Sequence, residues 1–354
     1  MRRKVTLEQV ARLAKVSPAT VSRVANASGR VSPQIEARVR RAAAHLQIEL
    51  KRKNKGKLIA FLLSNRQMLH PFHSRVLFGA ESYCASRDYN MVFLCFRYPP
   101  NVSWRELHLP SILQRPAVVD GFILAGTNSQ NLMDLLTHKG VPFAVLGNNV
   151  VGEWQSSAHD VVWFDDIRGA YEATRYLLSQ GHRDIWFEGN CRLPWFARRY
   201  QGCRQAMEEA GLTPRVAELD CDNERELGYL ATKSVLTRGE PVTAIFAGGD
   251  AAAQGVYKAL TDFGLRIPDE MSVVGFNDTE AAMLHPPLTT VGVFPEQVGR
   301  QLAETLINRI AHPDLAPQRA SIPTQLVKRE SCHRLSLVAQ EKGGGASDTT
   351  LREP

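Results

Sequence analysis

The stretch SPATVSRVANAS, residues 17–28, has a helical pattern, but its side chains are too small and too polar to build a protein core. In such a helix Val21, Val24 and Ala25 face inward. The outer face then consists of Pro18, Ala19, Ser22, Arg23 and Asn26. An arginine can donate two hydrogen bonds to a guanine, a serine can bond a base edge or a phosphate, and an alanine can touch a thymine methyl group. The residue types therefore predict a helix that reads DNA in the major groove.

Patterns typical of enzymes are absent from the sequence. There is no serine nucleophile elbow with His and Asp partners, no GxxxxGK[ST] phosphate loop and no His/Cys cluster at metal-ligand spacing. The 10 histidines are dispersed, and the 6 cysteines stand singly, which favours reduced thiols over disulfides or zinc. The sequence predicts a protein that is not an enzyme and that uses neither a metal nor a cofactor.

Three short helices would position the outer face of residues 17–28. Residues 6–9, TLEQ, have the pattern of a capping box, so a helix is expected to begin directly after Thr6. Ser17-Pro18 and Ser32-Pro33 are two further helix starts. Two helices joined by a tight turn, with a third packed behind, form a helix-turn-helix. The alternative is a solvated helical bundle in which Arg23 is only a surface residue.

The charge is distributed very unevenly along the 354 residues. Residues 1–57 contain 15 Lys and Arg against 3 acidic residues, a balance of +12, while the rest of the chain has a balance of −5. This concentration of positive charge in a small part of the chain favours a polyanionic partner over simple solvation of a surface.

From residue 58 onward the chain alternates between two kinds of pattern. Helix-length amphipathic stretches such as 170–180 and 251–263 separate ten β-rich runs: KLIAFLL, NMVFLC, DGFILAG, VPFAVLGN, DVVWFDD, RDIWFEGN, AELDC, TAIFAGG, SVVGFND and TTVGV. This alternation predicts parallel sheets with helices on both faces. About 280 residues are too many for one doubly wound sheet, so we expect two lobes. Ligands bind at the carboxyl ends of strands in such folds, which places a site in a cleft between the lobes.

Residues 5–46, VTLEQVARLAKVSPATVSRVANASGRVSPQIEARVRRAAAHL, resemble the DNA-binding headpiece of the lactose/galactose-repressor family. In that family the two residues after the Ser of the turn discriminate between operators. Here they are Pro18 and Ala19, which cannot donate side-chain hydrogen bonds, so recognition should depend on Arg23. The expected DNA contacts are Thr6, Ser17, Pro18, Ala19, Thr20, Ser22, Arg23, Asn26 and Arg30 in the headpiece, and Lys51, Arg52 and Lys53 in the linker.

The linker departs from the pattern of that family. It lacks the Pro-Asn start and the Ala-x-x-Leu hinge helix, and it is shorter. Residues 51–57 instead contain 5 Lys and Arg, which suit contacts with phosphates. Leu50 is the only candidate for a side chain that wedges into the minor groove.

The motifs VDGFIL, GHRDIWFEGN, RRYQG, GGDAAAQGVYKAL, IPDEMSVVGFNDTE and PPLTTV resemble the effector-binding core of the same family, which is related to periplasmic sugar-binding proteins. Arg199 matches an arginine that typically bonds ligand hydroxyls or a carboxylate. Asn277 matches a position usually held by an aspartate that binds sugar hydroxyls. The ligand contacts expected from this resemblance are His70, Phe72, Trp195, Arg199, Asp222, Asp250 and Asn277.

Two of these positions depart from the family pattern. Asn277 offers donors where a carboxylate offers only acceptors, and Asp222 stands where several sugar-sensing relatives carry an aromatic residue. Each residue also has a structural alternative. Asn277 and Asp250 could cap the helices that follow them, and Arg199 could pair with a helix carboxylate. Packing or purely structural roles are the alternatives for Trp195 and His70.

The expected organisation is an all-α helix-turn-helix headpiece at residues 1–48, a basic linker at 49–57 and an α/β core at 58–334. The core should be two-lobed and periplasmic-binding-protein-like, with doubly wound parallel sheets. Its lobes are expected at about 58–163 plus 292–320 and at about 164–291 plus 321–334. The polar tail, 335–354, is expected to be disordered, and because it contains no leucine heptad we expect a homodimer.

Together, the residues and the resemblance predict a ligand-responsive, sequence-specific DNA-binding transcriptional regulator. By family default it is a repressor whose homodimer reads a pseudo-palindromic double-stranded operator and whose small-molecule effector is a carbohydrate. The alternative is a regulator of the same fold that no longer responds to a small ligand. The sequence shows neither an 18-residue apolar run nor a signal peptide, so we expect no membrane contact and a cytoplasmic location. A transport binding protein is disfavoured by that missing signal peptide and by the headpiece.

Overall fold

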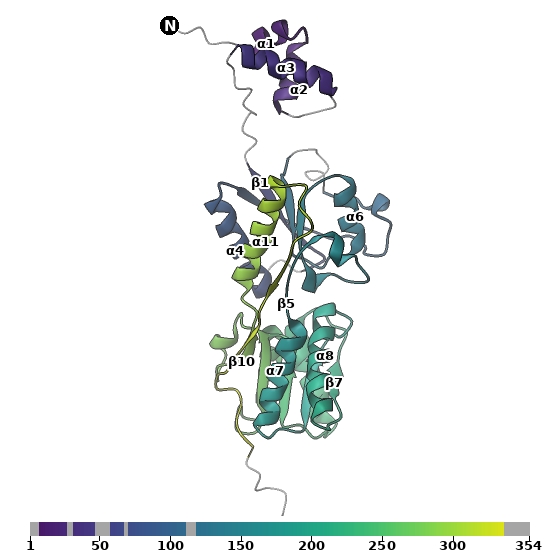
Figure 1. Ribbon diagram of the computed structural model, residues 1–354. Coiled ribbons are helices and arrows are strands. Elements are labelled where there is room, and N and C mark those ends of the chain that lie inside the picture. The colour runs from purple at the N-terminus through teal and green to yellow at the C-terminus, as the bar shows by residue number, and fades with distance from the viewer. Residues whose placement is uncertain (1–6, 27–30, 47–56, 67–69, 111–117, 336–354) are drawn as a thin grey trace, which may run out of the picture. The chain divides into compact units, whose positions relative to one another are not determined.

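The computed structural model describes residues 7–26, 31–46, 57–66, 70–110 and 118–335. The chain divides into two compact units, residues 1–58 and 59–354 (Figure 1). The predictions for Thr6, Arg30, Leu50, the linker lysines and arginines at 51–53 and the tail beyond residue 335 lie outside the described residues.

The first unit is a helix-turn-helix, as the sequence predicts. It contains α1 (Leu7–Leu13), α2 (Pro18–Asn26) and α3 (Pro33–His45). Ser17 Oγ accepts a hydrogen bond from Thr20 N at 3.1 Å, and Ser32 Oγ accepts one from Ile35 N at 3.4 Å, so both predicted cap residues stabilise helix starts. The core between the three helices consists of small apolar side chains: Val10, Ala11, Ala14, Val21, Val24, Val39, Ala42 and Ala43.

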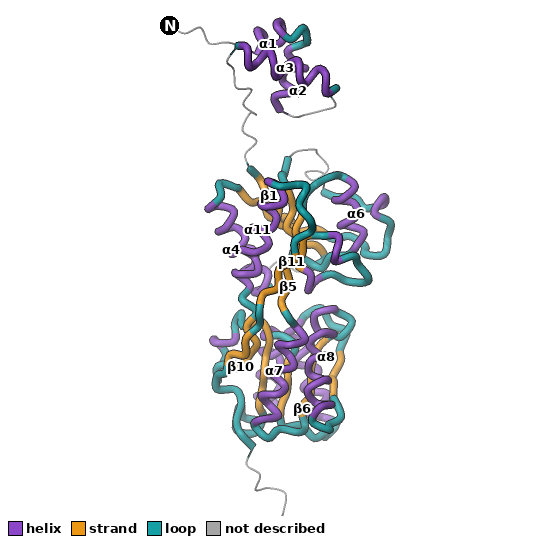
Figure 2. Tube along the Cα trace, viewed as in Figure 1, coloured by secondary structure: helices purple, strands orange, loops and turns teal. Residues whose placement is uncertain are grey.

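The second unit consists of two α/β lobes, each built on a six-stranded sheet, and this confirms the predicted fold class (Figure 2). The sheet of lobe 1 has the strand order β11-β5-β4-β3-β1-β2, and every pairing recorded in register is parallel. Its strands are β1 (Leu58–Ser64), β2 (Asn90–Phe96), β3 (Gly121–Leu124), β4 (Phe143–Leu146), β5 (Asp160–Phe164) and β11 (Arg319–Ile322). Its longer helices are α4 (Pro71–Ser86), α6 (Gln130–His138) and α11 (Pro295–Ala311).

Lobe 2 repeats this arrangement with the strand order β12-β10-β9-β8-β6-β7. Its strands are β6 (Ile185–Gly189), β7 (Arg215–Glu218), β8 (Ala244–Ala247), β9 (Ser272–Asn277), β10 (Thr289–Gly292) and β12 (Gln325–Val327). Only the pairing of β12 with β10 is antiparallel among those recorded. Its helices are α7 (Asp166–Ser179), α8 (Pro194–Glu209), α9 (Glu224–Thr237) and α10 (Asp250–Asp262).

Helices cover both faces of each sheet because successive strand residues point to opposite sides. In β1, Ile59 and Phe61 belong to the apolar cluster formed with α4 and α11, whereas Ala60 and Leu62 belong to the cluster formed with α6. Helices α4 and α11 lie side by side (Figure 1). Their approach requires glycine, since a Cβ atom added at Gly299 would lie 1.9 Å from Val76 O.

The chain passes from one lobe to the other three times, after β5, after β10 and between β11 and β12.

Two details of the sequence pattern differ from the structure. The strand expected around AELDC ends earlier, at Glu218, and the short strands β11 and β12 have no counterpart in the pattern because RASI and QLV lack a long apolar run. None of the described helices is long and apolar enough to cross a lipid bilayer.

A carboxylic acid lies in the middle of lobe 2. Glu188, on β6, is fully buried, and its Oε1 and Oε2 lie 3.1 and 3.0 Å from Thr232 Oγ1. Thr232 Oγ1 carries one proton and also lies 2.8 Å from Gly228 O, so its proton has three acceptors within reach, and a protonated carboxyl group at Glu188 could donate to the hydroxyl oxygen instead. Burial raises the pKa of Glu188 to about 8, consistent with a neutral acid.

This buried acid makes stability depend on pH. The folded state holds the proton of Glu188 up to about pH 8, whereas the unfolded chain releases it above about pH 4.5. Stability is therefore lost as pH rises through this window, by roughly 1 kcal/mol per pH unit. We expect Glu188→Gln, which supplies the same donor without a titrating proton, to be more stable than the wild type near pH 8 and to lose less stability between about pH 5 and pH 8.

Urea unfolding of both proteins across this pH range checks the prediction. Glu208→Gln is the matched control, because Glu208 is exposed on α8 and pairs with Arg204. A Glu188→Gln protein whose stability follows the wild-type pH dependence would show that Glu188 is ionised in the folded protein.

Candidate functional site

The outer face of α2 carries the side chains that could read DNA. Val21 and Val24 are buried against α1 and α3, while Pro18, Ala19 and Arg23 are exposed. Ala19 and Arg23 are four residues apart, so they lie one above the other on the same side of the helix. A guanidinium and a methyl group on one exposed helix face match the donors and apolar contacts that major-groove recognition uses.

The remaining residues expected to contact DNA differ in their surroundings. Ser17 and Thr20 bond each other through their hydroxyls at 2.9 Å, so both help to begin α2. Ser22 is half-buried, and the side chain of Asn26 is outside the described part of the structure. On α3, Arg38 and Arg41 are exposed, while Arg40 pairs with Glu36 at 2.7 Å. Arg38 and Arg41 therefore remain candidates for phosphate contacts.

In the second unit the carboxyl ends of the strands of both lobes border one cleft. We call it the interlobe cleft; its inner part is lined by Arg66, His70 and Phe72 of lobe 1 and by Trp195, Arg199, Glu224 and Asn277 of lobe 2. A wider part of about 190 Å³ continues past Arg66, His70, Asp222 and Glu224. Five residues expected to contact the ligand thus line the inner part, and Asp222 lines the wider part.

Arg199 organises the lobe 2 side of the cleft. Its side chain is 4% exposed and donates to Asp166 Oδ1 at 2.9 Å, to Gly248 O at 2.6 Å and to Asn277 Oδ1 at 3.1 Å. The guanidinium also stacks on the ring of Phe276 at 4.0 Å. Arg199 therefore pairs with a helix carboxylate, as one interpretation of the sequence proposed, and also lines the cleft.

Asp166 links this network to lobe 1. Its Oδ2 accepts hydrogen bonds from Arg198 Nε at 3.0 Å and from Asn148 Nδ2 at 2.8 Å. Arg198 also donates to the backbone oxygen of Asn148, which follows β4 in lobe 1, at 2.5 Å. The start of α7, where the chain enters lobe 2, is thus bonded to both lobes.

Glu224 forms the second link between the lobes. Arg66, at the end of β1, lies 3.5 Å from Glu224 Oε1, and His70 Nε2 lies 3.4 Å from Glu224 Oε2 without the alignment of a hydrogen bond. Burial opposes ionisation of Glu224, but the charges of His70, Arg66 and Arg199 outweigh it and lower the pKa of this carboxyl group to about 2. Glu224 is therefore ionised at neutral pH.

Aromatic rings supply the apolar part of the inner cleft. Phe72 contacts Phe164 edge to face, with ring centroids 5.8 Å apart. The Trp195 ring is covered by the guanidinium of Arg66, which lies 4.3 Å from the ring centroid. Trp195 is buried, so its face is occupied by another side chain rather than open to solvent.

Asp250 is placed differently from the other residues expected to bind ligand. It is fully buried, its Oδ1 accepts from Thr290 Oγ1 at 2.6 Å, and its Oδ2 accepts from Thr279 N at 2.7 Å. Burial raises the pKa of Asp250 to about 6. These contacts tie α10 to the segments around β9 and β10, and Asp250 does not line the cleft, so the geometry favours a structural role.

Sequence reasoning missed several residues of the inner cleft. These are Arg66, His73, Asn149, Phe164 and Glu224. Arg66, Asn149 and Phe164 follow or end strands, so the rule that ligands bind at carboxyl ends could have found them. Glu224 begins the helix after β7, and its acidic context, CDNE, was a weaker signal.

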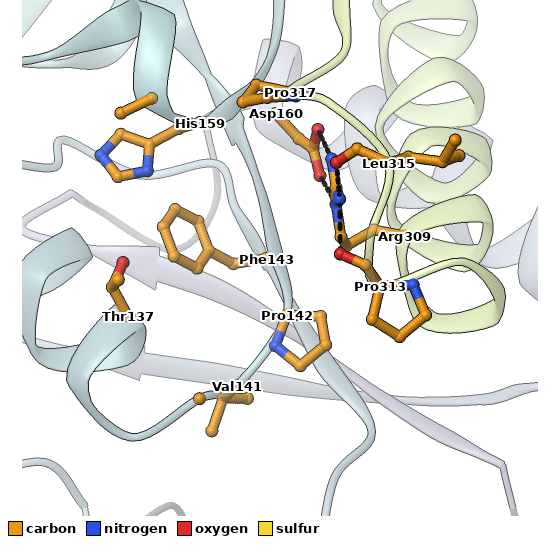
Figure 3. A pocket seen from close by; sticks show the side chains of 12 residues that line it. Thr137, Val141, Pro142, Phe143, His159, Asp160, Arg309, Pro313, Leu315 and Pro317 are labelled. Atoms are coloured by element: carbon orange, nitrogen blue, oxygen red, sulfur yellow. Dashed lines mark hydrogen bonds and ion pairs between the residues drawn. The ribbon is translucent and has the colours of Figure 1, made fainter.

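A larger hollow of about 350 Å³ lies elsewhere on lobe 1 (Figure 3). It borders the amino ends of β4 and β5, opposite to the edge where such folds bind ligands. Arg309 donates there to both carboxylate oxygens of Asp160 and to the backbone oxygens of Pro313, Leu315 and Ala316. All five of its N–H groups therefore have acceptors, and this hollow is a poorer candidate for the effector site than the smaller interlobe cleft.

A basic helix-turn-helix with an exposed arginine on its second helix, joined in one chain to a two-lobed binding core, defines a ligand-responsive DNA-binding transcriptional regulator. Known proteins agree with this class. Residues 6–47 match the family model of bacterial regulatory proteins of the lacI family, and residues 174–332 match the periplasmic binding protein-like domain. The ribose operon repressor of Haemophilus influenzae is 31% identical over 342 residues, covering 93% of this chain and 99% of that protein. The chain belongs to the lacI family.

Other similar proteins and solved structures are also transcriptional regulators. The HTH-type transcriptional repressor PurR of Haemophilus influenzae is 31% identical, covering 92% of this chain and 98% of that protein. The transcriptional regulator CelR in complex with cellobiose is 30% identical with a TM-score of 0.68, covering 93% of this chain and 100% of that structure. A lacI-family regulator from Enterococcus faecium with bound ribose is 26% identical with a TM-score of 0.67, covering 79% of this chain and 100% of that structure.

The exposed position of Arg23 leads to a prediction about specificity. We expect Arg23→Ala to relax the sequence preference at one base pair of each half-site and to cost roughly 1–3 kcal/mol there, because a bidentate contact to guanine would be lost. Selection of bound sequences from a random DNA pool checks this. Arg40→Ala is the control, since Arg40 also carries one positive charge but pairs with Glu36 on α3. If both variants weaken binding equally on all sequences, Arg23 contacts phosphate and not bases.

Proposed function

We propose that this regulator is a repressor that binds a pseudo-palindromic operator as a homodimer. Two copies of α2 related by a two-fold axis would read two half-sites, and a protein seated on a promoter blocks polymerase. The repressor relatives support this assignment. The basic residues around α2 and α3 would supply the sequence-independent part of the affinity.

Dimerisation through the second unit is part of this proposal. Phe78 on α4 is 64% exposed, and Met283, in the short 3-10 helix Ala281–Met283, is 88% exposed. Phenylalanine and methionine are enriched at protein–protein interfaces, so these two exposed side chains are candidates for contacts between the two copies. We propose that the partner that covers these side chains is a second copy of this chain.

We further propose that the effector is a carbohydrate or carbohydrate derivative bound in the interlobe cleft. The observation that carries this proposal is the convergence of polar side chains and aromatic rings from both lobes on one cleft at the strand carboxyl ends. The structures of relatives with bound ribose or cellobiose support the same class. A ligand that contacts both lobes would favour one lobe arrangement, and that differential affinity would set operator binding.

The alternative, a regulator without ligand response, is less consistent with the cleft. A cleft that had lost its ligand would not need to keep polar side chains from both lobes together, yet Arg66 and His70 of lobe 1 face Glu224 of lobe 2 across it. We also propose that the cleft binds without catalysing, and that the protein acts in the cytoplasm, where its DNA target lies.

Footprinting on the protein's own promoter region and on neighbouring operons tests the DNA side of this proposal. We expect a protected site with two symmetric half-sites. The ligand side is tested by thermal-shift screening with sugars, sugar derivatives and nucleosides, since a ligand raises the melting temperature by mass action. Each hit is then added to the operator complex. Failure of every hit to change operator affinity would favour the regulator without ligand response.

Arg199 gives a prediction about this response. We expect Arg199→Ala to abolish the effect of the ligand on operator binding, because the side chain lines the cleft and positions Asn277. Loss of the buried pair with Asp166 lowers the stability of this variant, but operator affinity of the folded protein without ligand should stay within a few-fold of the wild type. The measurement is operator binding with and without ligand, and Arg204→Ala, an exposed arginine on the same helix, is the control. A responsive Arg199→Ala protein would mean that the ligand binds elsewhere.

A further inference from the structure

Arg66 stands at the centre of the interlobe cleft. Its side chain lines the inner part, the wider part of about 190 Å³ and an adjoining hollow of about 150 Å³ that also includes Arg97 and Asp222. The guanidinium extends from lobe 1 onto Trp195 and toward Glu224 of lobe 2. Any ligand that fills the cleft must therefore contact Arg66 or displace it.

The partners that Arg66 has among the described residues use only part of its hydrogen-bonding capacity. The side chain is 15% exposed, and its ion pair with Glu224 is long, at 3.5 Å and through one nitrogen. A guanidinium has five N–H donors and pairs best with two oxygens at once. Glu224 is also shared with His70, so it cannot satisfy Arg66 alone. A buried cation in this situation gains from a second anionic partner.

His73 adds a neutral imidazole to the same cleft. Asn149 Nδ2 donates to Ala125 O at 3.0 Å and lies 3.1 Å from His73 Nε2. Burial, with the nearby charges of Arg66 and His70, lowers the pKa of His73 well below its usual value, so the ring is neutral. His73 is 2% exposed, and its Nδ1 has no hydrogen-bond partner among the described residues. With the ring proton on Nδ1, His73 would offer an N–H donor to a ligand in the inner cleft.

The inner cleft offers a ligand few carboxylate acceptors. Arg66, His70 and His73 bring nitrogens to it, and Glu224 is the only carboxylate that lines this part among the described residues. Arg199 also lines it, but its guanidinium already donates to Asp166, Gly248 and Asn277. Asn277 brings an amide to a position where a carboxylate would give acceptors alone. A neutral sugar hydroxyl both accepts and donates, so it needs acceptors that are scarce here. A carboxylate or phosphate group only accepts.

We propose that the effector carries an anionic group, a carboxylate or a phosphate, that binds Arg66 and accepts a hydrogen bond from His73. This inference rests on the proposed function of the cleft and narrows its ligand class to acidic carbohydrate derivatives. Arg66 is then the residue that sets the preference for an acidic ligand over its neutral parent.

The test is isothermal titration of the full-length protein at neutral pH and fixed ionic strength with matched series of probes. Each series contains a neutral sugar, its carboxylate and its phosphate: ribose, ribonate and ribose 5-phosphate, and glucose, gluconate and glucose 6-phosphate. Inorganic phosphate and acetate serve as anions without a sugar. We expect at least one anionic sugar to bind about 10-fold or more tightly than its neutral parent, and the carboxylate and phosphate arms identify which group is recognised.

Variants of Arg66 assign the preference to this residue. Arg66→Gln should lower the ratio of anionic to neutral affinity from about 10-fold to less than about 3-fold, even though it also affects the neutral parent, and Arg66→Lys should keep part of the ratio. Arg192→Gln is the control, because Arg192 is exposed, pairs with Asp220 and does not line the cleft. Near-ultraviolet circular dichroism confirms that each variant is folded.

The outcomes separate this inference from the proposed function. If neutral sugars bind as tightly as or more tightly than their acidic derivatives, the carbohydrate function stands and the inference falls. An Arg66→Gln protein that keeps the anion preference also overturns it. If only anions without a sugar bind, and do so through Arg66, the anionic site stands and the carbohydrate class falls. If no anionic probe binds at millimolar concentration, the inference is wrong.

Discussion

The buried ion pair between Arg199 and Asp166 is the interaction on which the core depends. Both side chains are almost completely removed from water, and an isolated charge in such a place would cost several kcal/mol. The cost is offset because Arg199 also bonds Gly248 and Asn277, while Asp166 also bonds Arg198 and Asn148. The first turn of α7 is thereby held to α8 and to the carboxyl ends of β8 and β9. The same network reaches lobe 1 through Asn148, at the point where the chain first changes lobe.

This network would let one cleft serve as both the proposed binding site and a switch. The residues that line the cleft come from both lobes, and they are held by contacts that themselves cross between lobes. A ligand that replaces or strengthens one of these contacts changes the relative stability of the lobe arrangements. Only such a difference in affinity can be passed on to operator binding. The first unit serves recognition instead, because its small core leaves Pro18, Ala19 and Arg23 of α2 exposed.

Much of this architecture follows from periodicity in the sequence. Ser17 and Ser32 mark helix starts with side-chain caps, and the alternating apolar runs give ten of the twelve strands because buried parallel strands need continuous apolar residues. The exceptions have a physical reason. Strands β11 and β12 are edge strands of four and three residues, so they require little apolar surface, and neighbouring strands rather than their own sequence define them.

The site was predictable only in part. Five predicted residues line the cleft: His70, Phe72, Trp195, Arg199 and Asn277. The family resemblance made them predictable, because it assigns them to the ends of strands and to the helices that follow. The pairing of Arg66 with Glu224 joins residues 158 positions apart, and no local pattern carries that information. Asp250 also ends a strand region, yet its oxygens are used by Thr279 and Thr290, which the sequence does not reveal. Whether a polar side chain is available to a ligand thus depends on hydrogen-bond partners that come from distant parts of the sequence.

The central claim is that ligand binding between the lobes and operator binding by the headpiece are energetically linked. The direct measurement is the dissociation constant of one effector for the free protein and for the protein saturated with its operator. The account predicts that the two constants differ, and that the ratio equals the factor by which the effector changes operator affinity, because linkage is reciprocal. Equal constants for the free and operator-bound protein would contradict it.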